Sequence, residues 1–277
     1  MKLNNLDIKF EITVVVPCYR LDLNFDFLDS LLYSILEQEE SKFLVKKIIL
    51  INDSPEYKLK DYINIEKFPL FFLLLENEKN LGQAFCRNLG LEHCSTDYIH
   101  FIDQDDLLDN KFYKNIIDIS DCMIANCVIF NEKKNRELYK RLRILIYKFY
   151  KTLGKLKWFL YFDNIILSPG QAVFKTEVVR KIGGFPNLIN FGSDDYGLMF
   201  KLCLENKKYT FNYKSKYLHR LHSGQGKNRL NINDSRNEFI NFIRKDKNNF
   251  FIRSCTQIDK LSQFIRKSLY ILFNNLI

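Results

Sequence analysis

Four short apolar runs alternate with helix-like stretches over the first hundred residues. The runs are rich in β-branched and aromatic residues and cover Ile12–Val16, Lys47–Ile51, Leu70–Leu75 and Tyr98–Ile102. Between them, Phe25–Gln38 and Leu81–His93 carry apolar residues three and four positions apart, the spacing of an amphipathic helix. Because strands separated by helices pair in parallel, this pattern predicts an α/β fold with a mostly parallel central sheet and helices packed on its faces.

Polar segments follow three of these four predicted strands. Pro17–Arg20 follows the first strand, Asn52–Ser54 the second and Asp103–Asp109 the fourth. Sheets of this kind bind ligands beyond the carboxyl ends of their strands, so we expect the three segments to meet at one edge. Each segment alone could be an ordinary turn, because Asn, Asp, Ser and Pro are common turn residues. Three of them at one edge indicate a binding site.

The segment after the fourth strand, in YIHFIDQDDLLDN, is strongly acidic. It places four carboxylates within seven residues, at Asp103, Asp105, Asp106 and Asp109. Carboxylates this close repel one another, and burying them without partners is costly. Hard divalent cations such as Mg²⁺ and Mn²⁺ prefer carboxylate oxygens, often with substrate phosphate completing the coordination. The segment is therefore either a solvated turn or a cation site, and Asp109 could cap a helix over Asn110–Ile119.

Other polar residues add to this site or have an ordinary structural explanation. Gly82 permits a tight entry to a helix, and the planar fork of Arg87 suits phosphate, carboxylate or a surface salt bridge. Asp194 and Asp195 lie at a predicted helix start, where a carboxylate caps the helix or accepts a proton from an attacking hydroxyl. His222 is either a metal ligand or a surface histidine.

Taken in order, these motifs resemble those of family 2 glycosyltransferases with the GT-A fold. The resemblance covers about Ile12 to Gly226. The matching segments are Val16-Pro17-Cys18-Tyr19-Arg20, Asn52-Asp53-Ser54-Pro55, Asn80-Leu81-Gly82, Arg87-Asn88-Leu89-Gly90, Asp103-Gln104-Asp105-Asp106, Gly183-Gly184-Phe185, Ser193-Asp194-Asp195 and Arg220-Leu221-His222.

The resemblance implies an inverting, metal-dependent transfer of sugar from a nucleotide-diphospho-sugar, with UDP as the expected nucleotide, to a hydroxyl of a glycan or lipid-linked acceptor. It implies Asp195 as the catalytic base, with Asp194 as the second candidate. Mn²⁺ or Mg²⁺ would be held by Asp105 with Asp103 or Asp106, and by His222. The residues expected to bind the donor are Pro17, Tyr19, Arg20, Asp53, Asn80, Gly82, Arg87, Asp103 and Gln104.

Two other functions are compatible with such a sheet. A nucleotidyltransferase would need a loop rich in glycine and lysine after the first strand, and Pro17-Cys18-Tyr19-Arg20-Leu21 is not one. A non-catalytic module that binds sugar nucleotides or membranes would have no need of the acidic cluster, Asp195 and His222. We therefore favour the enzyme.

The net charge of +9 is concentrated in one segment. Lys133–Phe162 carries ten Lys or Arg and one acidic residue among many aromatic residues. Such a segment suits an anionic membrane surface, although it could be a solvated helix face. We expect no nucleic-acid partner, because no recognition module is present. Together with a Lys-, Asn- and Ile-rich composition, this segment suggests bacterial surface polysaccharide biosynthesis.

Cysteine usage and the N-terminus favour a cytoplasmic protein, peripheral at the inner face of the membrane. Seven cysteines without a CxxC pair indicate buried thiols. No signal peptide and no apolar run long enough to span a membrane is seen. We expect a GT-A domain at residues 1–226, with a nucleotide-binding half (1–102) and a metal and acceptor half (103–226). Amphipathic helices are expected over 227–277.

Overall fold

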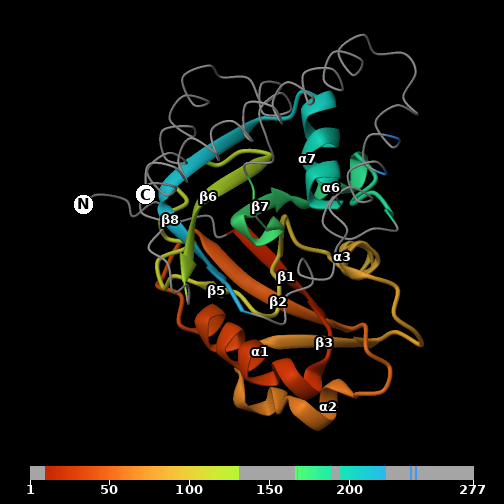
Figure 1. Ribbon diagram of the computed structural model, residues 1–277. Helices are drawn as coiled ribbons and strands as arrows, with labels where there is room; N and C mark the ends of the chain where they lie inside the picture. Colours follow the sequence, from red (N-terminus) through yellow and green to blue (C-terminus); the bar gives the residue numbers. More distant parts are fainter. Residues whose placement is uncertain are drawn as a thin grey trace, which may run out of the picture.

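An eight-stranded sheet with helices on both faces forms the framework of the protein (Figure 1). The computed structural model describes residues 10–130, 166, 168–188, 194–222, 238 and 241. The strands are β1 (Phe10–Cys18), β2 (Phe43–Asn52), β3 (Phe71–Glu76), β4 (Tyr98–Phe101), β5 (Leu107–Leu108), β6 (Cys122–Phe130), β7 (Ala172–Lys175) and β8 (Tyr209–Arg220). The helices are α1 (Leu21–Leu36), α2 (Leu59–Tyr62), α3 (Gln83–Glu92), α6 (Thr176–Lys181) and α7 (Asp194–Leu204), with 3-10 turns η1 (Ile65–Lys67) and η3 (Pro169–Gln171).

The first half of the sheet is parallel, as the alternating pattern predicts. Strands β3, β2, β1 and β4 lie side by side in this order, and each neighbouring pair is parallel. Successive residues of β1 face opposite sides, so that Val14 and Val16 enter one core and Val15 the other. Because both faces are covered, these strands are almost continuously apolar in sequence.

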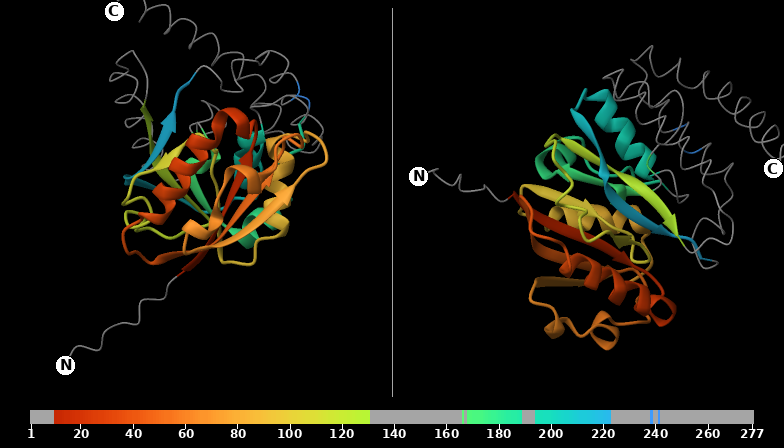
Figure 2. Two further views of the ribbon diagram at one scale, coloured as in Figure 1. Left: turned by 90° about the horizontal axis from the view of Figure 1, so that it is seen from below. Right: turned by 90° about the vertical axis from the view of Figure 1, so that its left-hand side faces the viewer.

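The second half of the sheet is mixed. Strand β7 runs antiparallel to both β4 and β6, β6 and β8 are parallel, and β5 is antiparallel to β8. Figure 2 shows β6 and β8 side by side along one side of the molecule. The predicted α/β arrangement is therefore present, and three of its four parallel strand pairs lie within β3 to β4.

Two apolar cores fill the space between the sheet and its helices. Helices α1 and α2 cover one face, and α3, α6 and α7 cover the other. A Cβ on Gly90 of α3 would lie 2.3 Å from a methyl carbon of Val15, so glycine is needed where α3 crosses β1. All six cysteines of the described residues are buried, as expected.

The helix predicted over Asn110–Ile119 is wrong: residues 110–115 form consecutive turns. Asp109 does cap this segment, since its Oδ1 accepts a hydrogen bond from the Lys111 N–H at 3.1 Å. The backbone N–H of Ile117 then donates to Asn212 Oδ1 at 3.0 Å, a partner outside the segment. The side chain of Asn212 thus accepts a hydrogen bond from a backbone N–H that, in a helix, would donate to a carbonyl of the same helix.

Several predictions fall outside the described residues. The basic segment 133–162 and, apart from positions 238 and 241, the extension 227–277 are among them. Membrane contact, the C-terminal helices and the domain boundaries stay predictions. Within the part of the chain that the structure describes, no helix is both long and apolar enough to cross a membrane.

His100, buried in β4 just before the acidic segment, should make stability depend on pH. Its Nε2 donates to Gly170 O at 2.7 Å, because a carbonyl can only accept, and Nδ1 lies 2.8 Å from the Tyr113 hydroxyl. Burial lowers the pKa of His100 to about 4. The unfolded chain takes up this proton near pH 6.5, so the free energy of unfolding should fall as the pH drops from about 6.5 toward 4.

The variant His100→Gln isolates this contribution, because an amide keeps a donor for Gly170 without titrating. Between pH 7 and 4.5, wild type should lose about 2 kcal/mol more stability than His100→Gln. Urea unfolding at both pH values measures the difference. Equal losses in the two proteins would show that His100 is not the group responsible.

Candidate active site

The three polar segments predicted at one edge of the sheet do meet there. The backbone N–H of Tyr19 donates to Gln104 Oε1 at 2.8 Å, and Gln104 Nε2 donates back to Tyr19 O at 2.7 Å. The backbone N–H of Arg20 donates to Ser54 Oγ at 2.7 Å. The loops after β1, β2 and β4 are therefore in direct contact, which confirms the shared edge.

Asp53 organises the expected donor side of this edge. It is buried, and its Oδ1 accepts from Asn77 Nδ2 at 2.9 Å and from the Leu81 N–H at 2.8 Å. Its Oδ2 accepts from the N–H of Gly82 at 2.8 Å, where a φ of 87° favours glycine. Asn80 Nδ2 donates to Asp53 O at 3.3 Å. The Asp53 carboxylate therefore fixes the path of the chain from Asn77 to Gly82.

The remaining donor-side candidates lie at the same edge with different exposure. Pro17 is half-buried in β1, whereas Tyr19 is 41% exposed. Arg20 adopts a left-handed backbone with a φ of 52°, and its guanidinium forms two bonds of 2.9 Å with Asp22. The Arg20 fork is thus engaged by a neighbouring carboxylate, whereas the Tyr19 ring is open to a ligand.

Arg87 is not on the surface but fully inside the protein, between two acidic motifs. Its Nη2 donates to Asp103 Oδ1 and its Nη1 to Asp194 Oδ2, both at 2.6 Å. The guanidinium also lies 5.2 Å from the Phe185 ring centroid. Arg87 was expected to bind the donor. In the structure its guanidinium contacts Asp103 and Asp194. It connects the turn Asp103–Asp106 after β4, called the acidic turn below, with the start of α7.

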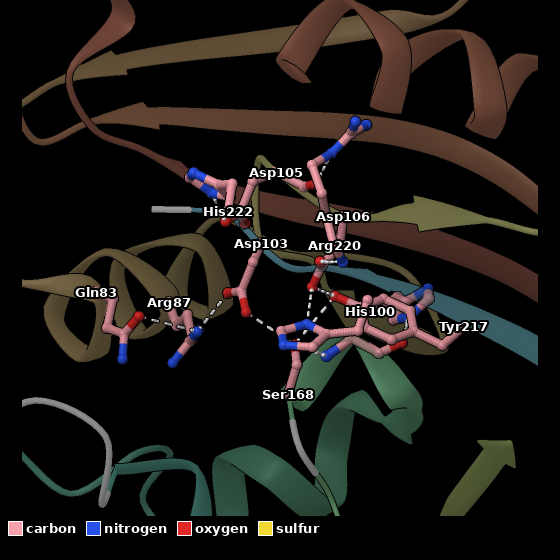
Figure 3. Close-up of polar contacts among 12 residues, drawn as sticks. Gln83, Arg87, His100, Asp103, Asp105, Asp106, Ser168, Tyr217, Arg220 and His222 are labelled. Carbon is pink, nitrogen blue, oxygen red and sulfur yellow. Dashed lines mark hydrogen bonds and ion pairs between the residues drawn. The ribbon is translucent and has the colours of Figure 1, made fainter. Parts of the chain in front are cut away.

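The three carboxylates of the acidic turn point in different directions (Figure 3). Asp106 is completely buried, with Oδ1 accepting from the Arg220 N–H at 2.7 Å. Its Oδ2 accepts from the Tyr217 hydroxyl at 2.5 Å and lies 3.0 Å from His219 Nδ1. Burial raises the pKa of Asp106 to about 6. Both oxygens are therefore taken by protein groups, which makes Asp106 a poor candidate for the predicted metal ligand.

Asp105 faces His222 instead. Asp105 Oδ2 and His222 Nε2 are 2.8 Å apart, and both side chains are about one fifth exposed. Burial works to raise the pKa of Asp105, but the hydrogen bond to His222, the charge of His222 and smaller contributions from its surroundings together leave that pKa below its ordinary value. Arg220 supports the turn by donating from Nε to Asp105 O at 2.7 Å. Its guanidinium is held 4.5 Å from the Phe27 ring centroid.

The Asp105–His222 pair fits a divalent cation bound in part by substrate. A carboxylate oxygen suits Mg²⁺ or Mn²⁺ and a neutral imidazole is a common metal ligand, so Asp105 and His222 would hold a cation in place of the hydrogen bond between them. Among the described residues no group of three or more His, Cys, Asp or Glu side chains forms a metal site. Mg²⁺ sites commonly use only one or two carboxylates and complete their coordination with water and substrate phosphates.

The two carboxylates at the start of α7 differ in their surroundings. Asp194 is 2% exposed, with Oδ2 bound by Arg87 and Oδ1 accepting from Gln83 Nε2 at 3.2 Å. Asp195 is half-buried and accepts the Tyr196 N–H at 2.7 Å. Burial, followed by the charge of Asp194, raises the pKa of Asp195. Of the two candidates for the base, Asp195 is the more accessible.

Sequence reasoning missed three residues of this network. Gln83 contacts Arg87 and Asp194, Ser168 contacts Asp103, and Tyr217 contacts Asp106. Ser168 had a weak signal, since it precedes a Pro-Gly turn. Tyr217 had none, because an aromatic residue in a strand is normally a core residue.

The strand order and the mixed pairing in the second half of the sheet are those of the GT-A fold, which two solved structures described below share. The chain belongs to Glycosyl transferase family 2, whose family model matches residues 13–183.

Two curated relatives are named for glycosyl transfer and for teichoic acid biosynthesis. Glycosyltransferase GlyA of Streptococcus pneumoniae is 25% identical over 231 residues, 77% of this chain and 31% of GlyA. Minor teichoic acid biosynthesis protein GgaB of Bacillus subtilis is 27% identical over 122 residues, 43% of this chain and 13% of GgaB. This chain therefore matches less than a third of the length of either relative.

Solved structures show the same fold. TarS 1–349 of Staphylococcus aureus, in complex with UDP-GlcNAc, has a TM-score of 0.61 and 17% identity, covering 84% of this chain and 64% of TarS 1–349. Mannosyltransferase PcManGT of Pyrobaculum calidifontis, in complex with GDP-Man and Mn²⁺, has a TM-score of 0.62 and 18% identity, covering 92% of this chain and 70% of the other. At these identities the likeness concerns the fold alone.

Proposed function

We propose that this protein is an inverting, metal-dependent glycosyltransferase that moves a sugar from a UDP-sugar to a hydroxyl of a glycan or lipid-linked acceptor in surface polysaccharide biosynthesis. The observation that carries the proposal is the Asp105–His222 pair. Gln104, next to Asp105 in the chain, bonds to Tyr19 in the loop that is expected to bind the donor. The UDP-GlcNAc bound to TarS supports a UDP donor, and the Mn²⁺ in PcManGT supports a divalent cation. The name of GgaB supports the class of acceptor.

The proposed chemistry needs three parts of the site. The loop held by Asp53 binds the nucleotide, and Asp105 with His222 holds Mn²⁺ or Mg²⁺. When bound, the cation offsets negative charge on the departing nucleoside diphosphate. Asp195 takes the proton of the acceptor hydroxyl while the oxygen of that hydroxyl bonds to the anomeric carbon, from the face opposite the diphosphate. The bond from that carbon to the diphosphate breaks, which inverts the configuration.

A panel of nucleotide sugars tests the function as a whole. The purified protein should be stabilised against heat by its donor in the presence of MnCl₂, because a ligand that binds only the folded state raises its stability. The same donor should then release nucleoside diphosphate slowly in the absence of acceptor. Stabilisation without any release would favour the non-catalytic binding module instead.

Asp105→Ala should remove metal-dependent nucleotide binding. Losing a carboxylate ligand should weaken UDP binding in MnCl₂ by at least about tenfold. Replacing residues that only hydrogen-bond to metal ligands already lowers metal affinity by about that factor. Isothermal titration calorimetry with and without MnCl₂ measures the effect. Asp109→Ala is the matched control, since its carboxylate is in the same segment but bonds to the Lys111 backbone. If Asp105→Ala bound UDP in MnCl₂ with the same affinity as wild type, Asp105 would not be a metal ligand.

A further inference from the structure

Two buried hydroxyl groups lie between the first and last carboxylates of the acidic turn. Ser168 Oγ donates to Asp103 Oδ2 at 2.8 Å, and the Tyr217 hydroxyl donates to Asp106 Oδ2 at 2.5 Å. The two hydroxyl oxygens are 3.0 Å apart (Figure 3). Each hydroxyl has one hydrogen, and each directs it at a carboxylate. Ser168 and Tyr217, both distant from the turn in sequence, thus each hold one end of it.

This pair of hydroxyls is held rigidly. Ser168 is 1% exposed and Tyr217 is fully buried. A Cβ on Gly170 would lie 2.4 Å from the Tyr217 hydroxyl, so the tyrosine ring packs directly against the η3 backbone. Burial and the charge of Asp106 raise the pKa of Tyr217 well above 10, which keeps its hydroxyl a donor.

The outer carboxylates of the turn each have a second anchor. Asp103 Oδ1 accepts from Arg87, and Asp106 Oδ1 accepts from the Arg220 N–H. With Asp103 and Asp106 bound on both oxygens, the backbone between them is fixed at two points. Asp105 lies between those points and extends toward His222.

We infer that Tyr217 and Ser168 are positioning residues that hold the acidic turn so that Asp105 meets His222. The inference rests on the proposed function, because it assumes that Asp105 and His222 bind the cation of the donor. Hydrogen-bonding partners behind metal ligands typically contribute about 10- to 100-fold in metal affinity or activity. Neither hydroxyl contacts the proposed reacting groups, so their effect acts through the geometry of the turn.

The test compares two buried tyrosines, Tyr217→Phe and Tyr113→Phe. Both variants keep the ring and lose one buried hydroxyl, but that of Tyr113 is paired with His100 and not with a carboxylate. Calorimetry of UDP binding at a series of MnCl₂ concentrations measures metal-dependent affinity, and thermal unfolding measures stability. We expect Tyr217→Phe to weaken UDP binding in MnCl₂ by about tenfold or more, with partial recovery at high MnCl₂. Tyr113→Phe should lower the melting temperature and leave the MnCl₂ dependence unchanged.

Ser168→Ala provides a second variant that leaves the tyrosine ring in place. It should shift the MnCl₂ dependence in the same direction, and the double variant should lose less than the product of the two single losses because both act on one turn. If Ser168→Ala and Tyr217→Phe both match Tyr113→Phe while wild type binds UDP with Mn²⁺, the inference is overturned and the proposed function stands. Wild type that binds no nucleoside diphosphate with Mn²⁺ would overturn both.

Discussion

Asp195→Asn should lower sugar transfer by about 10³-fold while nucleotide binding stays close to that of wild type. Asparagine has nearly the same shape as aspartate but cannot take a proton from an attacking hydroxyl. The loss should therefore appear in the rate of transfer, whereas calorimetric affinity for UDP in MnCl₂ should barely change. Because burial raises the pKa of Asp195, transfer by wild type should increase with pH through that pKa and then level off.

Asp194→Asn is the control for this experiment. The Asp194 carboxylate is buried and bound to Arg87, so its loss should reduce stability more than it reduces transfer. If Asp194→Asn abolished transfer in a folded protein while Asp195→Asn did not, the roles of the two carboxylates would have to be exchanged. Similar, modest losses in both variants would argue against a base at the start of α7.

Arg87→Met should destabilise the protein by about 3–5 kcal/mol, the usual cost of leaving a buried charge without its partner. The guanidinium is 1% exposed and lies 2.6 Å from carboxylate oxygens of both Asp103 and Asp194. Methionine fills similar space but leaves the buried Asp194 and the partly exposed Asp103 without the positive group between them. Urea unfolding should show the loss directly.

Arg180→Met provides a matched comparison. Arg180 is exposed and donates to backbone carbonyls of Leu91 and Cys94 near the end of α3, so its replacement should cost about 1 kcal/mol or less. The double variant Arg87→Met/Asp194→Asn should lose less stability than the sum of the losses in the two single variants. Asp194→Asn removes the negative charge that Arg87→Met leaves without a partner. An Arg87→Met variant as stable as Arg180→Met would show that the carboxylates do not depend on Arg87.

The parallel half of the sheet could be predicted because its information is local. Apolar runs such as Lys47–Ile51 are buried on both faces, and the helices between them have clear periodicity. The absence of a helix over 110–119 could not be predicted, because the backbone N–H of Ile117, just after the turns at 110–115, donates to Asn212, about a hundred residues away. A short stretch of sequence around Ile117 does not include Asn212 and therefore cannot predict this contact.

The candidate site divides in the same way. Asp53, Gln104 and Asp105 lie where strand ends and motif order predict them. The surroundings of Asp106 depend on Tyr217 and Arg220, which reach it from a strand more than a hundred residues later. The sequence left open whether Asp103 or Asp106 assists Asp105, and only the fold shows that protein groups occupy both oxygens of Asp106.

The ion pair between Arg87 and Asp194 also limits how such enzymes can be recombined. Arg87 comes from the segment before β4 and Asp194 from the start of α7, so the bond joins the two halves of the chain inside the protein. Each half expressed separately would carry an unmatched charge destined for the interior. A hybrid that imports a foreign segment containing the start of α7 must therefore bring an acidic residue to this point, whatever new specificity it is meant to acquire.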